Sequence, residues 1–311
     1  MKNNIRLSAS IFAGIVILCC VDILIGIAGD YTMTKLPDHT SQFSKSYYRM
    51  NRLETDIIVV GSSRGLHHYV TEVIQDSVNR YTNGTYSAYN ASIRGRFIDA
   101  NSCTAESIMD RWSPKLLIFD VTENEFAGAA KYQDMDFLAP LYKSNRFVRQ
   151  YIDSLCWEQR IKYASNMYRY NWKLPQIASS FFLHENKTGY EPLFPIMTEP
   201  LSSQNDEPIT IDAYSAGNFS RVLKTAKEKN IQMIVVSSPR FGHVCENKVI
   251  TAFCKEYDIP YIDMYNHVLF NEHPEYFQDP LHLNDVGAHI FTSLLFERLK
   301  PYLRGMMEPL D

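Results

Sequence analysis

Residues 56–63 read Asp-Ile-Ile-Val-Val-Gly-Ser-Ser, a short run of β-branched apolar residues that ends in a glycine and two serines. A continuous apolar run of this length is typical of a strand that is buried on both faces, as in a parallel sheet. Three comparable runs follow along the chain, at residues 115–120, 231–236 and 260–263. We predict that each of these four runs forms a buried strand.

The segments between these runs have the length of helices. Residues 219–229 precede the third run, residues 247–257 precede the fourth, and residues 285–303 close the chain. Helices that alternate with strands are typical of an α/β fold with a central parallel sheet. The sequence therefore predicts an α/β domain over residues 53–311.

Residues 126–215 interrupt this alternation. The stretch is rich in tyrosine and tryptophan, contains no clear strand and ends in residues rich in proline, serine and asparagine. We predict a mostly helical insertion followed by an irregular loop. Its aromatic side chains could stack on sugar rings, but the simpler interpretation is that they fill a small helical core.

The first 29 residues have the pattern of a membrane segment. Lys2 and Arg6 precede an apolar run over residues 11–28, which only Asp22 interrupts. The run is about 18 residues long, close to the roughly 20 residues that cross a bilayer as a helix. We predict an uncleaved signal anchor over residues 1–29, followed by a polar tether over residues 30–52. Asp22 is costly in such a span, so it could face a partner helix or lie near the outer interface.

Two other interpretations of this segment remain open. A cleaved signal peptide would need a small-residue cleavage site, and Ile27-Ala28-Gly29 offers a weak one. A lipoprotein signal would end at Cys19 or Cys20, but Leu18 is not the small residue that lipid attachment requires. Because the basic residues should stay in the cytoplasm, we expect a single-pass protein whose main domain is extracytoplasmic.

The overall composition excludes some classes of function. The formal net charge is −4 with both signs mixed, and no lysine- or arginine-rich run indicates a nucleic-acid partner. The histidines and the six cysteines lack metal-site spacing, so no metal ion and no cofactor are expected. Cys245 and Cys254 could pair outside the cytosol, or both could be buried free thiols.

The two serines that follow the first predicted strand are candidate nucleophiles. Ligands of an open parallel sheet bind beyond the carboxyl ends of its strands, where a serine hydroxyl would meet a substrate. Alternatively, Ser62 or Ser63 could simply cap the next helix. The turn alone does not separate these two interpretations.

A second motif supplies the base that a serine nucleophile needs. Residues 279–284 read Asp-Pro-Leu-His-Leu-Asn, immediately before the last predicted helix. A histidine can take the serine proton, and a carboxylate can fix the histidine tautomer and stabilise its charge. Asp279 and His282 lie three residues apart and can face one pocket, although the loop could also serve only to cap the helix through Asn284 or Asp285. Together with a serine after a strand, the pair predicts a catalytic triad.

Four sequence blocks, taken in order, resemble the SGNH (GDSL-like) hydrolase superfamily over residues 55–125 and 217–303. Gly61-Ser62-Ser63 is similar to the GDS block, with Ser63 in the place of the nucleophile. Residues 90–95 resemble the second block, whose glycine is Gly95 here. Residues 114–125 resemble the third block, a strand followed by GxND, and residues 279–282 match the last block.

The chain departs from the family pattern at three positions. Ser62 replaces the aspartate of GDS, as in membrane-anchored members such as the D-alanyl transfer protein family. Thr122 replaces the glycine of GxND and Glu125 replaces its aspartate, while Asn124 falls on its asparagine.

The resemblance implies a flavodoxin-like three-layer α/β fold with a central parallel sheet, to which the helical insertion and the N-terminal membrane helix are added. It also implies acyl transfer, in which Ser63 attacks an ester, His282 is the base and Asp279 orients His282. The N–H groups of Ser63 and Gly95 and the side-chain amide of Asn124 would form the oxyanion hole.

The implied function is an extracytoplasmic serine esterase, if water is the acceptor, or an O-acyltransferase, if a sugar hydroxyl is. The expected substrate is an acyl ester, with acetyl favoured, of a cell-envelope glycan, and a membrane acyl-transfer protein is a possible partner. The alternative is a catalytically inactive SGNH-like protein that binds a glycan or serves such a partner.

Overall fold

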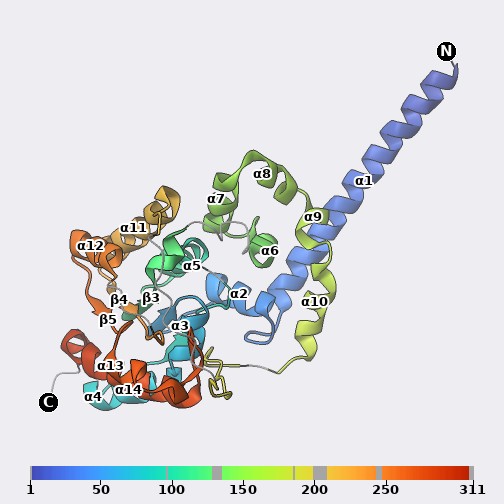
Figure 1. Ribbon diagram of the computed structural model, residues 1–311. Coiled ribbons are helices and arrows are strands. Elements are labelled where there is room, and N and C mark those ends of the chain that lie inside the picture. Colours follow the sequence, from blue (N-terminus) through green and yellow to red (C-terminus); the bar gives the residue numbers. More distant parts are fainter. Residues whose placement is uncertain are drawn as a thin grey trace. The chain divides into compact units, whose positions relative to one another are not determined.

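The computed structural model describes residues 2–95, 97–127, 135–184, 186–198, 209–242 and 247–307. The chain forms two compact units (Figure 1). The helical unit comprises Met1–Tyr48 and Met135–Glu185, and the sheet unit comprises Arg49–Asp134 and Asn186–Asp311. Cys245, one of the two cysteines that could form a disulfide, lies outside the described residues.

The sheet unit is built on five parallel strands in the order β2-β1-β3-β4-β5. The strands are β1 (Ile57–Val60), β2 (Ala88–Asn90), β3 (Leu116–Asp120), β4 (Gln232–Ser237) and β5 (Tyr261–Asp263). This is the strand order of flavodoxin-like doubly wound folds. The predicted α/β class and central parallel sheet are therefore confirmed.

Helices cover both faces of this sheet, which gives three layers. Alternate side chains of β1, β3 and β4, such as Ile57, Ile118 and Ile234, form one core with α4 (Thr71–Thr82) and α14 (Asp285–Leu299). On the other face Phe119 packs against Phe219 of α11 (Ala213–Glu228). Figure 1 shows α5 (Ile98–Arg111), α11 and α12 (Lys248–Tyr257) on that side.

Short elements complete the sheet unit. They are α3 (Ser63–His68), α13 (Val268–Asn271), the antiparallel strands β6 (Phe277–Asp279) and β7 (His282–Leu283), and the 3-10 helices η1 (Glu123–Ala127), η4 (Pro274–Tyr276), η5 (Lys300–Tyr302) and η6 (Arg304–Met306). Strands β6 and β7 pair only with each other, in a small separate sheet. This sheet contains Asp279 and His282, two of the residues predicted for catalysis.

The described part of the insertion is helical, as predicted. Its elements are α6 (Met135–Leu138), η2 (Ala139–Leu141), α7 (Arg146–Leu155), α8 (Trp157–Ala164), α9 (Asn166–Tyr170), α10 (Lys173–Ser179) and η3 (Ser180–Phe182). Tyr142, Tyr151, Tyr163 and Tyr170 are all buried, so these aromatics do fill a helical core. Of this stretch, Met135–Glu185 belongs to the helical unit, together with Met1–Tyr48.

The predicted tether over residues 30–52 is corrected by the structure. Helix α1 (Lys2–Lys35) runs through its first part, and α2 (Gln42–Asn51) occupies its last part. Met33, Leu36, Phe43 and Met50 are each at most 3% exposed. Burial of these scattered apolar residues drives the stretch to fold. They give no clear pattern in the sequence, because most of the residues around them are polar.

Helix α1 is long and apolar enough to cross a membrane. An 18-residue window within Arg6–Lys35 has a mean hydropathy of 2.8, and most of its side chains are exposed. Length and composition alone are shared by membrane anchors and signal sequences.

Candidate active site

Ser63 is the first residue of α3, at the carboxyl end of β1. The turn before it is tight: a Cβ on Gly61 would lie 2.9 Å from the Asp120 side chain at the end of β3, so only glycine fits without a shift. Ser62 occupies the N-cap position, but its side chain makes no capping hydrogen bond. The capping interpretation thus accounts for the position of Ser62 and leaves the Ser63 hydroxyl for another role.

The structure brings Ser63, His282 and Asp279 together. Ser63 Oγ lies 2.8 Å from His282 Nε2, although the two residues are 219 positions apart. His282 Nδ1 lies 2.9 Å from both carboxylate oxygens of Asp279. With the proton on Nδ1 donated to Asp279, Nε2 is free to accept the Ser63 proton, which is the tautomer that a general base requires.

The β6–β7 turn holds the aspartate and the histidine in this arrangement. Asp279 Oδ1 also accepts hydrogen bonds from the backbone N–H groups of Leu281 (2.8 Å) and His282 (3.0 Å). Burial works to raise the pKa of Asp279, but the hydrogen bonds and charge of His282 outweigh it, so the pKa is lowered and the carboxylate stays ionised. Asn284 caps α14 by accepting a hydrogen bond from Gly287 N–H. Capping of the helix therefore does not require Asp279 or His282, although they belong to the same loop.

His68 connects the helix that carries Ser63 to the strand that carries His282. Its Nε2 accepts the backbone N–H of Leu283 (3.0 Å), so its Nδ1 bears the proton and donates to Ser238 Oγ (3.0 Å). The residue is fully buried, and burial, followed by the charge of Arg64, holds its pKa well below the ordinary value. His68 is therefore a neutral tie between α3 and β7.

His67 packs directly against the candidate base. Its ring meets that of His282 edge to face, with centroids 5.7 Å apart. Its Nδ1 lies 2.6 Å from the Glu191 carbonyl oxygen, and its Nε2 lies 3.2 Å from the Arg94 guanidinium. Burial, which the hydrogen bond to Glu191 only partly opposes, lowers the pKa of His67 to about 4, so it is neutral and helps to fix the His282 ring.

Gly95 and Asn124 follow β2 and β3, the two neighbours of β1 in the sheet. Ile93 N–H donates to Gly61 O (3.1 Å), which keeps the loop of Gly95 beside the serine turn. Gly95 has φ of 70°, a conformation that favours glycine, and Asn124 is an exposed residue of η1. Both residues thus lie at the carboxyl edge of the sheet, as Ser63 does, and their role as oxyanion donors stays a prediction.

A buried polar network lies beneath the serine turn. Asp120, at the end of β3, accepts from Tyr69 Oη (2.8 Å) and Ser238 N–H (3.0 Å). Arg64, next to Ser63, donates to the carbonyl and the hydroxyl of Ser238 and lies over the Tyr265 ring at 4.8 Å. This network fixes the start of α3 against β3 and β4.

Glu125 belongs to the same buried region. Burial and the nearby charge of Asp120 raise its pKa to about 8, despite the opposing charge of Arg64 and a hydrogen bond with Ser62. Its Oε2 is buried and has no hydrogen-bond partner among the described residues, which makes the ionised form unfavourable. The departure from the GxND pattern at this position thus places a neutral acid behind Ser62.

His68, His67 and Glu125 were not identified as site residues from the sequence. The signal for the histidines was their place directly after the serine turn. The signal for Glu125 was its place in the third block, where the family has aspartate. Neither pattern reveals which partners the fold supplies.

The described residues also line a cavity of about 280 Å³ at the start of α14. Its lining residues are Leu193, Phe194, Ile196, Glu275, Tyr276, Asn284, Asp285 and Val286. Ser63, Asp279 and His282 are not among them, so the candidate active site is assigned on the chemistry of its side chains.

No protein-family model and no curated protein matches the chain. Among solved structures, the chain is similar to a lipase/acylhydrolase from Enterococcus faecalis, with 13% identity and a TM-score of 0.40, over 82% of this chain and 98% of that one. It is also similar to a GDSL-like lipase from Bacteroides thetaiotaomicron, with 12% identity and a TM-score of 0.37, over 83% of this chain and 99% of that one. At such low identities and scores the likeness concerns the fold and says nothing further about chemistry.

Proposed function

We propose that this protein is a serine esterase or O-acyltransferase of the SGNH type that works through an acyl-serine intermediate. The observation that carries the proposal is the continuous hydrogen-bonded chain from Ser63 through His282 to Asp279, with donor–acceptor distances of 2.8 and 2.9 Å. Residues so far apart in the sequence meet in this order only if the fold brings them together. A nucleophile, a base and an ionised carboxylate are the parts that acyl transfer needs.

In the proposed reaction each group has one task. Ser63 Oγ attacks the ester carbonyl as its proton passes to His282 Nε2, and Asp279 stabilises the resulting imidazolium. The tetrahedral intermediate collapses when His282 returns the proton to the leaving alcohol, which leaves the acyl group on Ser63. Water or a sugar hydroxyl then attacks the acyl-serine as its proton passes to His282. When the second tetrahedral intermediate collapses, His282 returns this proton to Ser63 Oγ, so the acyl group leaves on the acceptor and Ser63 is regenerated.

The negative oxygen of the intermediate needs preorganised donors. We assign this role to the N–H groups of Ser63 and Gly95 and to the Asn124 side-chain amide, because all three residues lie at the carboxyl edge of the sheet. The loss of one such donor typically lowers kcat by about 100- to 1000-fold. A replacement of Asn124 by alanine should fall within this range.

We further propose that α1 anchors the protein with the sheet unit outside the cytoplasm. The apolar exposed surface of α1 and the basic residues Lys2 and Arg6 in its first turns support this orientation. An acyl ester of a cell-envelope glycan, with acetyl favoured, is then the proposed substrate, and a membrane acyl-transfer protein the proposed partner. The ordered triad favours an enzyme over an inactive glycan-binding protein.

The decisive experiment is active-site labelling of the full-length protein with a fluorophosphonate, which reacts with activated serines. We expect labelling of the wild type and of the matched control Ser62→Ala, and none of Ser63→Ala. The wild type and Ser62→Ala should also hydrolyse p-nitrophenyl acetate, and Ser63→Ala should not. Equal labelling of the wild type and Ser63→Ala, or no labelling of either when both are folded, would overturn the proposed mechanism.

A further inference from the structure

The helical unit has a polar contact that the proposed chemistry does not use. Asp22, in the middle of the apolar helix α1, accepts hydrogen bonds from Ser165 Oγ (2.7 Å), Asn166 Nδ2 (3.0 Å) and Met167 N–H (2.8 Å). All three donors belong to the start of α9 in the insertion. The Asp22 carboxylate, which would be costly without partners in a membrane span, therefore accepts three hydrogen bonds.

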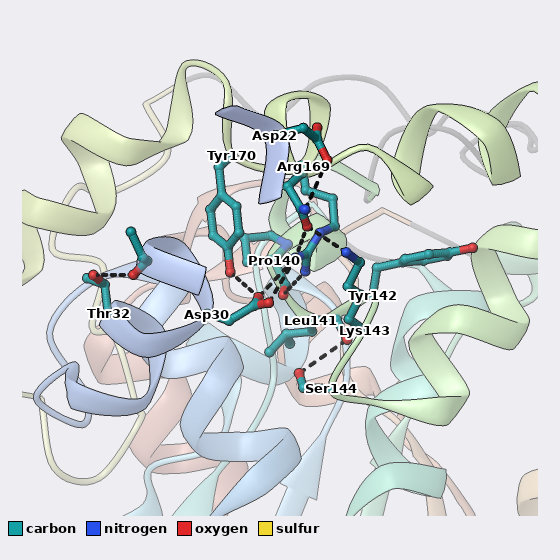
Figure 2. Close-up of polar contacts among 12 residues, drawn as sticks. Asp22, Asp30, Thr32, Pro140, Leu141, Tyr142, Lys143, Ser144, Arg169 and Tyr170 are labelled. Atoms are coloured by element: carbon teal, nitrogen blue, oxygen red, sulfur yellow. Dashed lines mark hydrogen bonds and ion pairs between the residues drawn. The ribbon is translucent and has the colours of Figure 1, made fainter. Parts of the chain in front are cut away.

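A second contact lies two turns farther along α1 (Figure 2). Asp30 forms an ion pair with Arg169, with Nη2 and Oδ1 3.0 Å apart, and accepts from Tyr170 Oη at 2.5 Å. The Arg169 side chain is 0% exposed and also donates to the Pro140 carbonyl at 3.1 Å. A buried guanidinium with these partners fixes α1 to both α9 and η2.

The backbone of α1 fits the insertion closely at two glycines. A Cβ on Gly26 would collide with the Asn166 side chain, and one on Gly29 would collide with the Tyr170 ring. Gly26, Gly29 and Met33 are buried at helical spacing, while Ile23, Leu24 and Ile27 on the other side of α1 are exposed. The helix therefore has one face built for the insertion and another face of exposed apolar side chains.

Because Asp22 binds the start of α9, the depth of Asp22 in a membrane also sets the depth of α9. The apolar run extends to Ala28, about six residues beyond Asp22, and a helix rises about 1.5 Å per residue. Asp22 and its partners would then lie about 9 Å inside the outer end of a membrane span. Interfacial helices reach about 5–10 Å into the boundary between lipid headgroups and acyl chains.

The insertion exposes the side chains that such a position requires. Large apolar residues of α8 to η3 that lie open to solvent include Trp157 (68% exposed), Ile161, Met167, Trp172, Phe181 and Phe182 (86% exposed). Figure 1 shows α9 and α10 alongside the part of α1 that carries the contacts. Tryptophan is enriched at membrane–water interfaces, whereas an exposed apolar surface of this kind is unfavourable in water.

We propose that the helical insertion is a membrane-inserted element: α8 to η3 enter the outer lipid leaflet beside α1, and α1 is a permanent part of this unit. The proposal rests on the membrane-spanning role of α1 in the proposed function. The occupant of the exposed apolar surface is the bilayer itself, because the same compact unit carries a helix long enough to span it and Asp22 of that helix binds the start of α9.

The test uses bromine on the lipid acyl chains, which quenches tryptophan fluorescence on contact. The chain has three tryptophans, and single-tryptophan variants of the full-length protein in nanodiscs retain Trp157, Trp172 or Trp112, with phenylalanine at the other two positions. We expect brominated phosphatidylcholine to reduce the emission of Trp157 and Trp172. Trp112, whose Nε1 donates to the Thr55 carbonyl in the sheet unit, is the control and should keep its emission.

Unchanged emission of Trp157 and Trp172 would overturn the proposal. If aqueous iodide quenches them instead, the surface faces water; if neither agent does, a protein covers it. Intact mass and membrane fractionation of the same samples report on the anchor. A chain that lacks residues 1–28 refutes the anchor in the proposed function, whereas an anchored chain without bromine quenching refutes only the insertion of α8 to η3.

A pair of variants at Asp22 tests the contact between α1 and α9. Asp22→Asn keeps an acceptor oxygen, whereas Asp22→Leu removes all acceptors while making α1 more apolar. We expect Asp22→Leu, and not Asp22→Asn, to increase protease cleavage within residues 135–185 and to weaken bromine quenching of Trp157. Equal protection of both variants would show that the contact does not position the insertion.

Discussion

At the scale of the residue, the triad is a cooperative unit. Ser63→Ala and His282→Ala should each lower kcat for an acetyl ester by about four to six orders of magnitude, because neither group works without the other. The double variant should be little worse than either single one. Ser62→Ala should be much milder, since it removes a hydrogen bond to Glu125 and not the nucleophile. Steady-state kinetics decide, and additive losses in the double variant would show that the residues act separately.

Glu125 should make the stability of the sheet unit depend on pH. Its pKa rises from 4.5 to about 8 on folding, so the unfolded chain releases this proton at lower pH than the folded protein does. Stability from this group is complete below about pH 4.5 and falls as pH rises towards about 8, by at most about 1.4 kcal/mol per pH unit. Asp279 has the opposite sign, because its lowered pKa makes stability fall only as pH drops below its ordinary value of 3.8.

Glu125→Gln isolates this effect, because glutamine resembles the protonated acid and cannot ionise. The difference in unfolding free energy between the variant and the wild type should be small near pH 5 and should increasingly favour the variant up to pH 8. Chemical denaturation at a series of pH values measures it. Glu256→Gln, at an exposed position of α12, should show no such trend. A flat difference for Glu125→Gln would mean that Glu125 is ionised in the folded protein.

At the scale of the element, the hydrogen bond between His68 and Leu283, which links α3 to β7, should control turnover. His68→Ala would leave the buried Leu283 N–H without its acceptor and would remove one of the two partners of the Ser238 hydroxyl, which keeps Arg64, at a cost of about 1–3 kcal/mol in stability. A small shift of β7 would misplace His282 and lower kcat by up to about 100-fold. KM should change little, because His68 does not reach the substrate. His68→Gln, which can still accept from Leu283 N–H, should recover part of kcat; an equal loss in both variants would contradict this role.

The elements also show why some structure could be predicted and some could not. The strands β1, β3, β4 and β5 were evident as apolar runs, but β2 is only Ala-Tyr-Asn and gains its place by pairing with β1. Residues 30–52 gave no such signal, because their buried apolar positions are few and widely spaced. Ser63, Asp279 and His282 could be identified because short motifs hold them. His68 and Glu125 could not, because tertiary packing alone supplies their partners.

At the scale of the whole molecule, the two units divide the work. The triad and its supporting histidines belong to the sheet unit, whereas the apolar helix and its polar contacts belong to the helical unit. A substitution confined to the helical unit should therefore affect stability and membrane attachment without changing the chemistry at Ser63.

Arg169→Met tests this division. Methionine fills most of the space of the arginine but leaves Asp30 without its ion-pair partner and frees the Pro140 carbonyl and the Asn166 side chain. Breaking a buried ion pair at one partner costs about 3–5 kcal/mol, and the half-exposed Asp30 places the expected loss at the lower end, about 3 kcal/mol. Protease cleavage within residues 135–185 should rise, while fluorophosphonate labelling of Ser63 proceeds at the wild-type rate. Lys162→Met, at an exposed position of α8, is the control that removes a positive charge without breaking a buried contact. If Arg169→Met abolishes labelling of Ser63 while Lys162→Met does not, the two units fold as one and the division fails.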